Sequence, residues 1–292
     1  MKSISLPLAL VKPYWKRSLC ALGMLAALVA TDLSIPRLIQ RLIDRGIFPS
    51  DQAEVISTGI LMLIISVSGT VFAVGNNIFS VRVGESVARD LRRKLFRKIQ
   101  SLSSRELANT GTGQLMVRLT SDTAAIQRLT QVSLRIGTRA PLMMLGSLIL
   151  MIRTSPGLAL SMLPLLVVTS AMIVLFVPRM EPLFGKVQAR LDRLNTVLHE
   201  NIAGVRLVRA FVRNDLEDGR FDSANVSFAS DSAGVMRFMA LLSPLLTVFV
   251  NVGMVLVIWN GGLDAIRGGI TAGQLVAFSN YLVSTMTPLV MM

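Results

Sequence analysis

Thiol and imidazole groups are nearly missing from this sequence of 292 residues, which has one cysteine, Cys20, and one histidine, His199. A single cysteine cannot form a disulfide within the chain, and a single histidine excludes a histidine-rich metal site. Charge is also scarce, because 16% of the residues are Asp, Glu, Lys or Arg, whereas soluble domains average about a quarter. The composition is that of a membrane protein, and we expect no metal site and no resident cofactor in this chain.

The sequence also lacks the G-x-x-x-x-G-K-[ST] loop that cradles the phosphates of ATP. Its only Gly-Lys pair, Gly185-Lys186, is followed by Val187, and Met180 stands where the first glycine is required. We therefore expect no catalytic site in this chain. An intramembrane enzyme would need a nucleophile with its base, or a metal cluster, at membrane depth, and one histidine does not supply either.

Long uncharged runs are what the sequence has instead. Four runs exceed the roughly 20 residues that cross a bilayer as a helix, and two less clean runs, around Asp32 and Arg139, raise the prediction to six spans. The expected spans are residues 18–43, 55–81, 130–152, 155–178, 238–263 and 270–292. A cleaved signal peptide is the alternative interpretation of the first span, although no clean A-x-A site follows it.

Basic residues are concentrated between the spans. Segments 1–17, 82–139 and 179–237 hold 25 of the 30 Lys and Arg residues and 12 of the 17 acidic residues, so they carry the whole net charge of +13. The positive-inside rule places these segments, and with them the N-terminus, in the cytoplasm. This placement gives no indication of a nucleic-acid partner. We predict a multi-pass protein of the cell (inner or plasma) membrane, in contact with the lipid bilayer.

Two of the cytoplasmic segments, residues 82–129 (the first arm) and residues 179–237 (the second arm), have amphipathic helical spacing. Apolar side chains recur every three or four positions in each arm. We expect the first arm to break at residues 109–113, in "ANTGTGQL", and the second to break at residues 214–219 and to return from Phe221. Each arm is thus predicted to be a helical hairpin, and a limb of some 25 residues would reach about 40 Å.

Three motifs in order extend this pattern over nearly the whole chain. The first arm contains "LRRKLFRKIQSL" and "TGQLMVRLTSD" (residues 91–102 and 112–122), and the second contains "ENIAGVRLVRAFVRNDLEDGRF" (residues 200–221). The last stretch, residues 268–292, reads "GGITAGQLVAFSNYLVSTMTPLVMM". Together they resemble the transmembrane domain of type I exporters of the ATP-binding-cassette (ABC) family, including its E-x-x-x-G-x-x-x-V-(K/R)-A-F-x-x-E-x-x-x-x-x-F motif and the start of its sixth span.

The resemblance implies an all-α membrane fold of six transmembrane helices with two long cytoplasmic helical extensions. It also implies the permease half of an ATP-driven transporter that exports a hydrophobic or amphipathic substrate by alternating access. The partners would be ABC ATPase domains, which carry ATP and Mg, and a second transmembrane half, either identical or different, to complete a dimer.

In this family each arm ends in a short coupling helix that sits in a cleft of an ATPase domain. Carried over by resemblance, the expected coupling residues are Glu106, Leu107, Asn109, Gly113, Phe211, Arg213, Asp215, Leu216 and Phe221. Two departures from the family pattern are visible: Glu106-Leu107 replaces a frequent aromatic pair, and Asn214-Asp215 replaces a single Glu. Long helices that merely pack together in the cytoplasm are the plainer explanation of the arms.

Polar residues within the spans mark a candidate substrate cavity. Arg128, Arg135 and Arg139 are spaced by seven and four residues, so we expect them to share one helix face. The candidate cavity residues are Arg135, Arg139, Asn76, Asn77, Asn251, Asn280 and Tyr281. Two alternatives stay open: the arginines could snorkel to lipid phosphates or pair with an acid on another span, and the Asn and Tyr side chains could form hydrogen bonds between helices.

The apolar run from Ile270 ends at Met292 without a Lys or Arg anchor. We interpret the sequence as a fragment of a longer polypeptide that is an ATP-hydrolysing translocase, with a separately encoded ATPase as the alternative. Two rival functions remain. A membrane sensor or scaffold with signalling helices would show heptads without glycine breaks, and an ion-coupled carrier would have buried acids, whereas the spans hold only Asp32.

Overall fold

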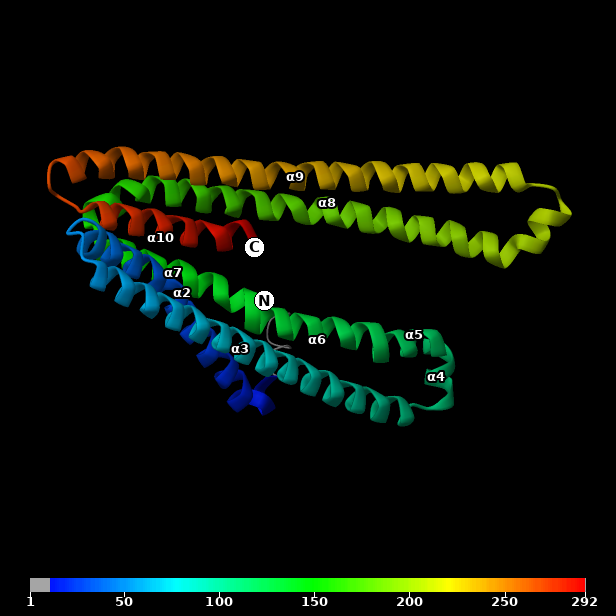
Figure 1. Cartoon of the computed structure of the whole chain (residues 1–292). Helices are drawn as coiled ribbons and strands as arrows, with labels where there is room; N and C mark the ends of the chain where they lie inside the picture. Colours follow the sequence, from blue (N-terminus) through cyan, green and yellow to red (C-terminus); the bar gives the residue numbers. More distant parts are fainter. Residues whose placement is uncertain (1–10, 292) are drawn as a thin grey trace. The chain divides into compact units, whose positions relative to one another are not determined.

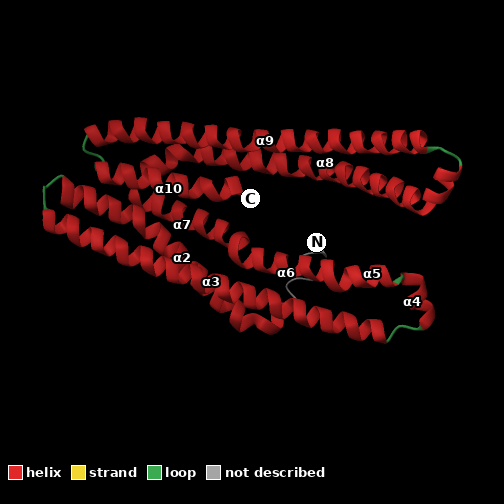
Figure 2. Ribbon diagram, turned by 45° about the vertical axis from the view of Figure 1, so that its right-hand side comes forward, coloured by secondary structure: helices red, strands yellow, loops and turns green. Residues whose placement is uncertain are grey.

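The computed structural model describes residues 11–291, and this part of the chain is nearly all helix (Figures 1 and 2). Within it, nothing is described of the side chains of residues 108–110, of several residues between 163 and 177, of residues 242–243 and of residues 286–291. The described residues form no strand. The prediction of an all-α fold is therefore confirmed.

The elements follow one another with few connecting residues. In chain order they are η1 (Lys12–Tyr14), α2 (Trp15–Arg41), η2 (Leu42–Ile47), α3 (Gln52–Gln100), α4 (Ser104–Thr110), α5 (Thr112–Val117), η3 (Arg118–Asp122), α6 (Thr123–Val132), η4 (Ser133–Gly137), α7 (Thr138–Thr154), α8 (Pro156–Ala210), α9 (Asn214–Ile266) and α10 (Ala272–Met291). Elements η2, η3 and η4 are π-helical turns.

The chain divides into two compact units, Met1–Leu160 with Leu256–Met292, and Ser161–Val255. In the first unit α2 packs against α3, and α10 packs against α7 and α2. Phe278, Tyr281 and Leu282 are at most 1% exposed. They lie on one stripe of α10, at the spacing of three and four residues that a helix uses to cover a core.

The start of α10 is held by a carboxylate from η2. Asp44 Oδ1 accepts a hydrogen bond from the Gly273 backbone N–H at 3.0 Å, and its Oδ2 accepts one from the Thr271 hydroxyl at 2.6 Å. Thr271 and Gln274 also cap each other. The Thr271 backbone N–H donates to Gln274 Oε1 at 2.8 Å, and the Gln274 backbone N–H donates to Thr271 Oγ1 at 3.1 Å. A negative charge at a helix N-terminus is favourable because the unpaired N–H groups and the helix dipole attract it.

In the second unit α8 and α9 run antiparallel, side by side (Figures 1 and 2). Leu194 and Val197 of α8 and Val235 of α9 are buried. The rings of Phe176 and Phe238 stack with their centroids 5.1 Å apart. The apolar stripe predicted for the second arm is thus used partly to join its two limbs, which makes the hairpin a self-supporting rod.

Four helical stretches of the described residues are long and apolar enough to cross a membrane, as judged by length and composition. They are Lys12–Ile47, Gln52–Gln100, Thr112–Thr154 and Asn214–Ile266. The predicted first, second, third and fifth spans lie within them. The predicted fourth span lies almost wholly in α8, and α10 covers residues 272–291 of the predicted sixth span, whose last residue, 292, is outside the described part. The six-span topology stays a prediction.

Replacement of Gly273 by Ala is expected to destabilise the first unit by about 1–3 kcal/mol, the usual cost of overpacking. A Cβ at this position would lie 2.6 Å from the Gln40 carbonyl oxygen and 2.6 Å from Asp44 Oδ1, so backbone must move. The measurement is thermal unfolding in detergent or nanodiscs. Gly262→Ala is the matched control, because a Cβ there meets nothing within 4 Å. Equal melting of the two variants would contradict the close contact.

Candidate transport groove and arm ends

The end of the first arm contains a short separate helix, α4, between the limbs formed by α3 and by α5 (Figure 1). Ser103 and Glu106 form a capping box at its start: the Glu106 carboxylate accepts hydrogen bonds from the Ser103 backbone N–H at 2.8 Å and from its hydroxyl at 2.9 Å. Gly111 terminates it with a φ of 73°, a conformation that glycine adopts without strain.

The prediction of one break at residues 109–113 was therefore incomplete. The chain turns twice, first at residues 101–103 and then at Gly111. The backbone of Asn109 is inside α4, and its side chain lies outside the described part. Gly113 belongs to α5. The local S-x-x-E pattern of Ser103 to Glu106 is the signal that could have revealed the first turn.

The end of the second arm is a tight turn, and its predicted position was wrong. Helix α8 ends at Ala210, and α9 begins at Asn214, so residues 214–219 are helical. Val212 has a φ of 52°, and the backbone N–H of Arg213 bonds the Val208 carbonyl at 3.0 Å, which closes the helix end. Asp215 and Glu217 lie in the first turn of α9, where acidic side chains favour a helix.

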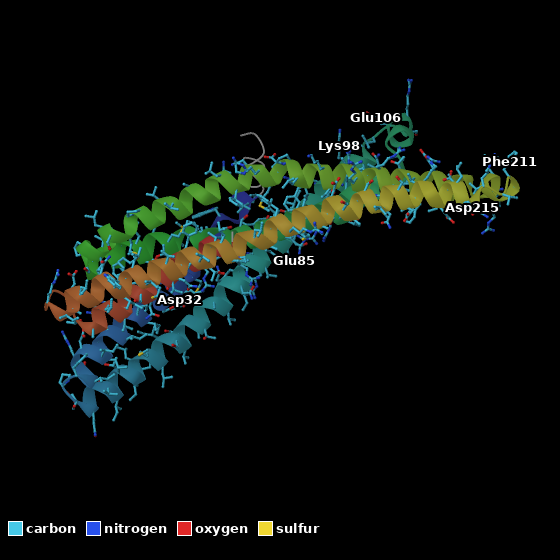
Figure 3. All side chains as sticks on the ribbon, turned by 90° about the horizontal axis from the view of Figure 1, so that it is seen from above. Asp32, Glu85, Lys98, Glu106, Phe211 and Asp215 are labelled. Carbon is cyan, nitrogen blue, oxygen red and sulfur yellow. The ribbon has the colours of Figure 1, made fainter. Side chains whose placement is uncertain are left out.

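The turn presents large apolar side chains to the surroundings. Phe211 is 69% exposed, Val212 79% and Leu216 54%. Phe211 and Asp215 lie at the end of the α8–α9 hairpin, as Figure 3 shows. Adjoining apolar residues left uncovered at a polar tip are a feature of surfaces that bind a partner. Arg213 and Phe221 are also exposed.

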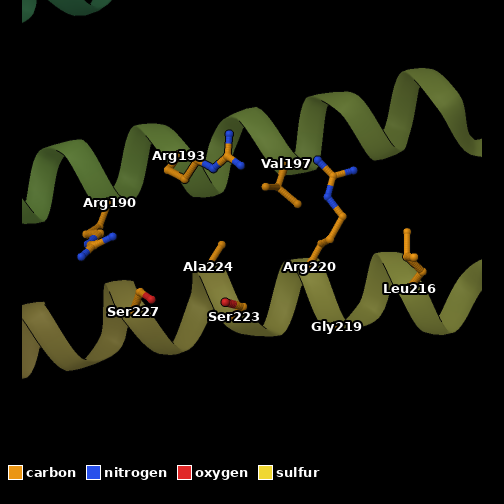
Figure 4. Close-up of a pocket in the computed structure, with 9 residues that line it drawn as sticks. All are labelled: Arg190, Arg193, Val197, Leu216, Gly219, Arg220, Ser223, Ala224 and Ser227. Atoms are coloured by element: carbon orange, nitrogen blue, oxygen red, sulfur yellow. The ribbon is translucent and has the colours of Figure 1, made fainter.

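Ion pairs join the two limbs just behind this turn. Arg220 of α9 contacts Glu200 of α8 at 2.7 Å and Glu217 at 2.9 Å, and further back Arg190 pairs with Asp231 at 2.9 Å. A cleft of about 480 Å³ opens between the limbs here (Figure 4). Its lining consists of Arg190, Arg193, Val197, Leu216, Gly219, Arg220, Ser223, Ala224 and Ser227.

In the first unit the structure brings four of the candidate cavity residues together. They line a groove of about 250 Å³ between α2, α3 and η4–α7, with Leu25, Leu28, Ala73 and Val74 as apolar walls. These four candidates are Asn76, Asn77, Arg135 and Arg139. Arg128, which was expected on the same helix face but not in the cavity, does not line this groove.

The π-helical turn η4 carries Arg135 into the groove. Pro141 follows it in α7 and has no N–H to donate to the Gly137 carbonyl, so the regular ladder is interrupted at this point. Inserted π-turns of this kind are common at functional sites. Arg135 is exposed, and no acidic partner contacts it among the described side chains.

The second arginine is paired. Arg139 Nη2 lies 2.9 Å from Asp32 Oδ2 of α2, which is one of the alternatives that the sequence left open. Asp32 itself borders an adjoining groove of about 230 Å³ that also contains Thr31, Ser66 and Thr70. Both partners are partly exposed, with side-chain exposures of 49% for Arg139 and 34% for Asp32.

Asn76 also bonds to two backbone carbonyls, and the three candidates outside the groove have other surroundings. Asn76 is buried and donates to the carbonyls of Ala21 at 2.8 Å and Leu134 at 3.5 Å, so it links three helical segments. Tyr281 is buried in the core, with its hydroxyl 3.3 Å from the Leu33 carbonyl. Asn280 bonds within α10, and Asn251 belongs to the second unit.

Comparison with known proteins agrees with this architecture. The family model described as "ABC transporter transmembrane region" matches residues 19–289. The chain therefore belongs to this family, and its fold is that of an ABC exporter transmembrane domain.

Individual relatives are similar over most of the chain. The chain is 32% identical over 286 residues to an uncharacterized ABC transporter ATP-binding protein of Mycobacterium tuberculosis, with 96% of this chain and 48% of the relative covered. It is 29% identical over 274 residues to an uncharacterized ABC transporter ATP-binding protein of Bacillus subtilis, with 94% of this chain and 48% of the relative covered. It is also 29% identical over 207 residues to an ATP-dependent lipid A-core flippase of Desulfotalea psychrophila, with 71% of this chain and 36% of the relative covered. The chain thus spans about half the length of the curated relatives it matches.

We expect α4 to loosen in acid because of Glu106. The hydrogen bonds from Ser103 hold the pKa of Glu106 below its ordinary value. A lowered folded-state pKa means that the stabilisation is complete above the ordinary pKa of about 4.3 and is lost as the pH falls through the folded value. Protection factors of the α4 amides, measured by hydrogen exchange, should fall severalfold over this interval. In Glu106→Gln, which keeps the cap without the titration, the same acid sensitivity would contradict this assignment.

Proposed function

We propose that this chain is the permease half of an ATP-driven ABC exporter, coupled to ATPase domains through the ends of its two arms. The exposed apolar turn of the second arm is the observation that carries this proposal. Phe211 and Leu216 are costly to leave in water, and aromatic and aliphatic anchors of this kind dominate binding when they enter a partner's pocket. The relatives named as ATP-binding proteins support an ATPase as that partner.

The construction of the arms supports transmission of a movement. The first arm places a capped helix, α4, between two turns, so α4 can dock as a unit. In the second arm the Arg220–Glu200 pair ties α9 to α8 behind the turn, and Glu217 of α9 holds the same guanidinium. A push on either end would therefore be passed to a helix that also contains a predicted span.

The groove in the first unit supports an amphipathic substrate with an anionic group. Its walls are apolar, and Arg135 supplies a cation that no described acidic side chain neutralises. Charged side chains at membrane depth usually face a cavity or a partner because lipid does not solvate them. One relative is named a lipid A-core flippase, which supports a lipid-like molecule.

A photo-crosslinker at Phe211 is expected to capture an ATPase domain in intact membranes, because this side chain is exposed at the turn. The readout is an adduct identified by mass spectrometry. Met236, which is 60% exposed and lies on the shaft of α9, is the matched control and should give no such adduct. Capture from Met236 alone, or capture from neither site, would count against coupling through this end.

The double variant Arg135→Gln/Arg139→Gln is expected to weaken the stimulation of ATP hydrolysis by anionic amphiphiles by about tenfold in apparent affinity, as loss of a close charge contact does. The assay is ATPase activity of the transporter in lipid with rising amphiphile concentration. Arg128→Gln is the matched control, since Arg128 lies on the same helical stretch but outside the groove. Unchanged stimulation in the double variant would remove the groove from the transport route.

A further inference from the structure

The two grooves of the first unit adjoin each other along α2 and α3. They share Leu28 and Ala73 as lining residues. One compartment holds Arg135 and Arg139, and the other holds Asp32, whose surroundings include the hydroxyls of Thr31, Ser66 and Thr70. A single molecule that lies over Leu28 and Ala73 could therefore contact both compartments.

The Asp32–Arg139 ion pair lies at the junction of the compartments. Each partner lines a different one, and the two atoms are 2.9 Å apart. Because Asp32 is close enough to neutralise Arg139, the two adjoining grooves together have one uncompensated positive charge, that of Arg135. At the membrane depth predicted for these residues water is scarce, so the number of unpaired charges matters. A second unpaired charge would carry a large free-energy cost of desolvation.

We propose that Asp32 is a specificity-determining residue, which makes the groove select amphiphiles with a monoanionic headgroup over those with a dianionic one. This inference rests on the proposed function of the same groove. A headgroup with one negative charge is matched by Arg135. A headgroup with two negative charges would need Arg139 as well as Arg135. It would have to displace the Asp32 carboxylate from Arg139, and the displaced carboxylate, left without a partner, would then repel the headgroup.

The second compartment suits neutral hydroxyl groups of the same ligand. The hydroxyl hydrogens of Thr31 and Thr70 are already donated to the carbonyls of Leu28 at 2.7 Å and Ser66 at 3.1 Å. Their oxygens therefore remain as acceptors, and the exposed Ser66 hydroxyl can both donate and accept. A phosphodiester that carries a glycerol group has the two features in one headgroup.

The test compares lysophosphatidylglycerol, a monoanionic phosphodiester, with lysophosphatidic acid, a monoester that is dianionic well above its second pKa of about 6. Binding to the intact transporter in nanodiscs is measured by native mass spectrometry at such a pH. Wild type should prefer the diester. Asp32→Asn should shift the ratio of the two affinities toward the monoester by about tenfold, the order of size of a close charge contact. Inorganic phosphate, which has no acyl chain, should compete with neither.

Two further variants separate charge from structure. Asp32→Asn/Arg139→Gln has neither partner of the pair but restores one net positive charge, so it should regain the preference of wild type. Glu54→Gln removes the acid of another ion pair between α2 and α3, Arg41–Glu54 at 2.6 Å, which lies outside the groove. It should leave the preference unchanged. Thermal unfolding of each variant checks that it is folded.

The outcomes are distinct. If wild type prefers the diester but Asp32→Asn does not alter the ratio, or if the double variant behaves like Asp32→Asn, the role of Asp32 is refuted while the groove remains a binding site. If wild type prefers the monoester, the inference is refuted. If wild type binds neither amphiphile and ATP hydrolysis does not respond to them, the proposed function of the groove fails together with the inference. Competition by inorganic phosphate alone would show that the site binds phosphate and not an amphiphile.

Discussion

A polar side chain on an apolar helix needs a partner, because lipid and tightly packed hydrocarbon offer none. Several contacts of the first unit meet this requirement, although the buried hydroxyls of Ser18, Thr58 and Ser80 have no hydrogen-bond partner among the described residues. The Ser147 and Thr285 hydroxyls bond each other at 2.7 Å between α7 and α10, Asn76 reaches the Ala21 carbonyl of α2, and Asp32 pairs with Arg139. Each contact joins helices that apolar packing alone would leave free to slide, since neighbouring helices and lipid are equally apolar.

Arg135 has no acidic partner among the described side chains either, but unlike those hydroxyls it is charged and lines a groove. The side chain sits on the π-helical turn η4, at the edge of an apolar groove, beside the already neutralised Arg139. A cation in such a place is available to the anionic substrate proposed above. The same reasoning applies to the apolar turn of the second arm, where Phe211 and Val212 remain uncovered.

Periodicity predicted much of this structure. The helical spacing of apolar residues predicted both arms, and the predicted first break contained Gly111. These features could be read from the sequence because periodicity and glycine positions are local signals. The turn at residues 211–213 carries no Gly or Pro, and Val212 adopts a positive φ, so the helix end could not be read from the usual breakers. The Asp32–Arg139 pair joins residues 107 positions apart. Sequence alone could name pairing as an option but could not choose the partner, because depth and rotation of the helices decide it.

Arg220 gives the second arm a mechanical property. Its guanidinium is held by Glu200 of the other limb and by Glu217 of α9 itself, so sliding of α8 past α9 near the turn would break the Arg220–Glu200 contact. Exposed charge pairs are screened by salt, so this resistance to sliding is expected to weaken as the ionic strength rises. In the proposed coupling, transmission of movement along the second arm would therefore depend on the salt concentration around it.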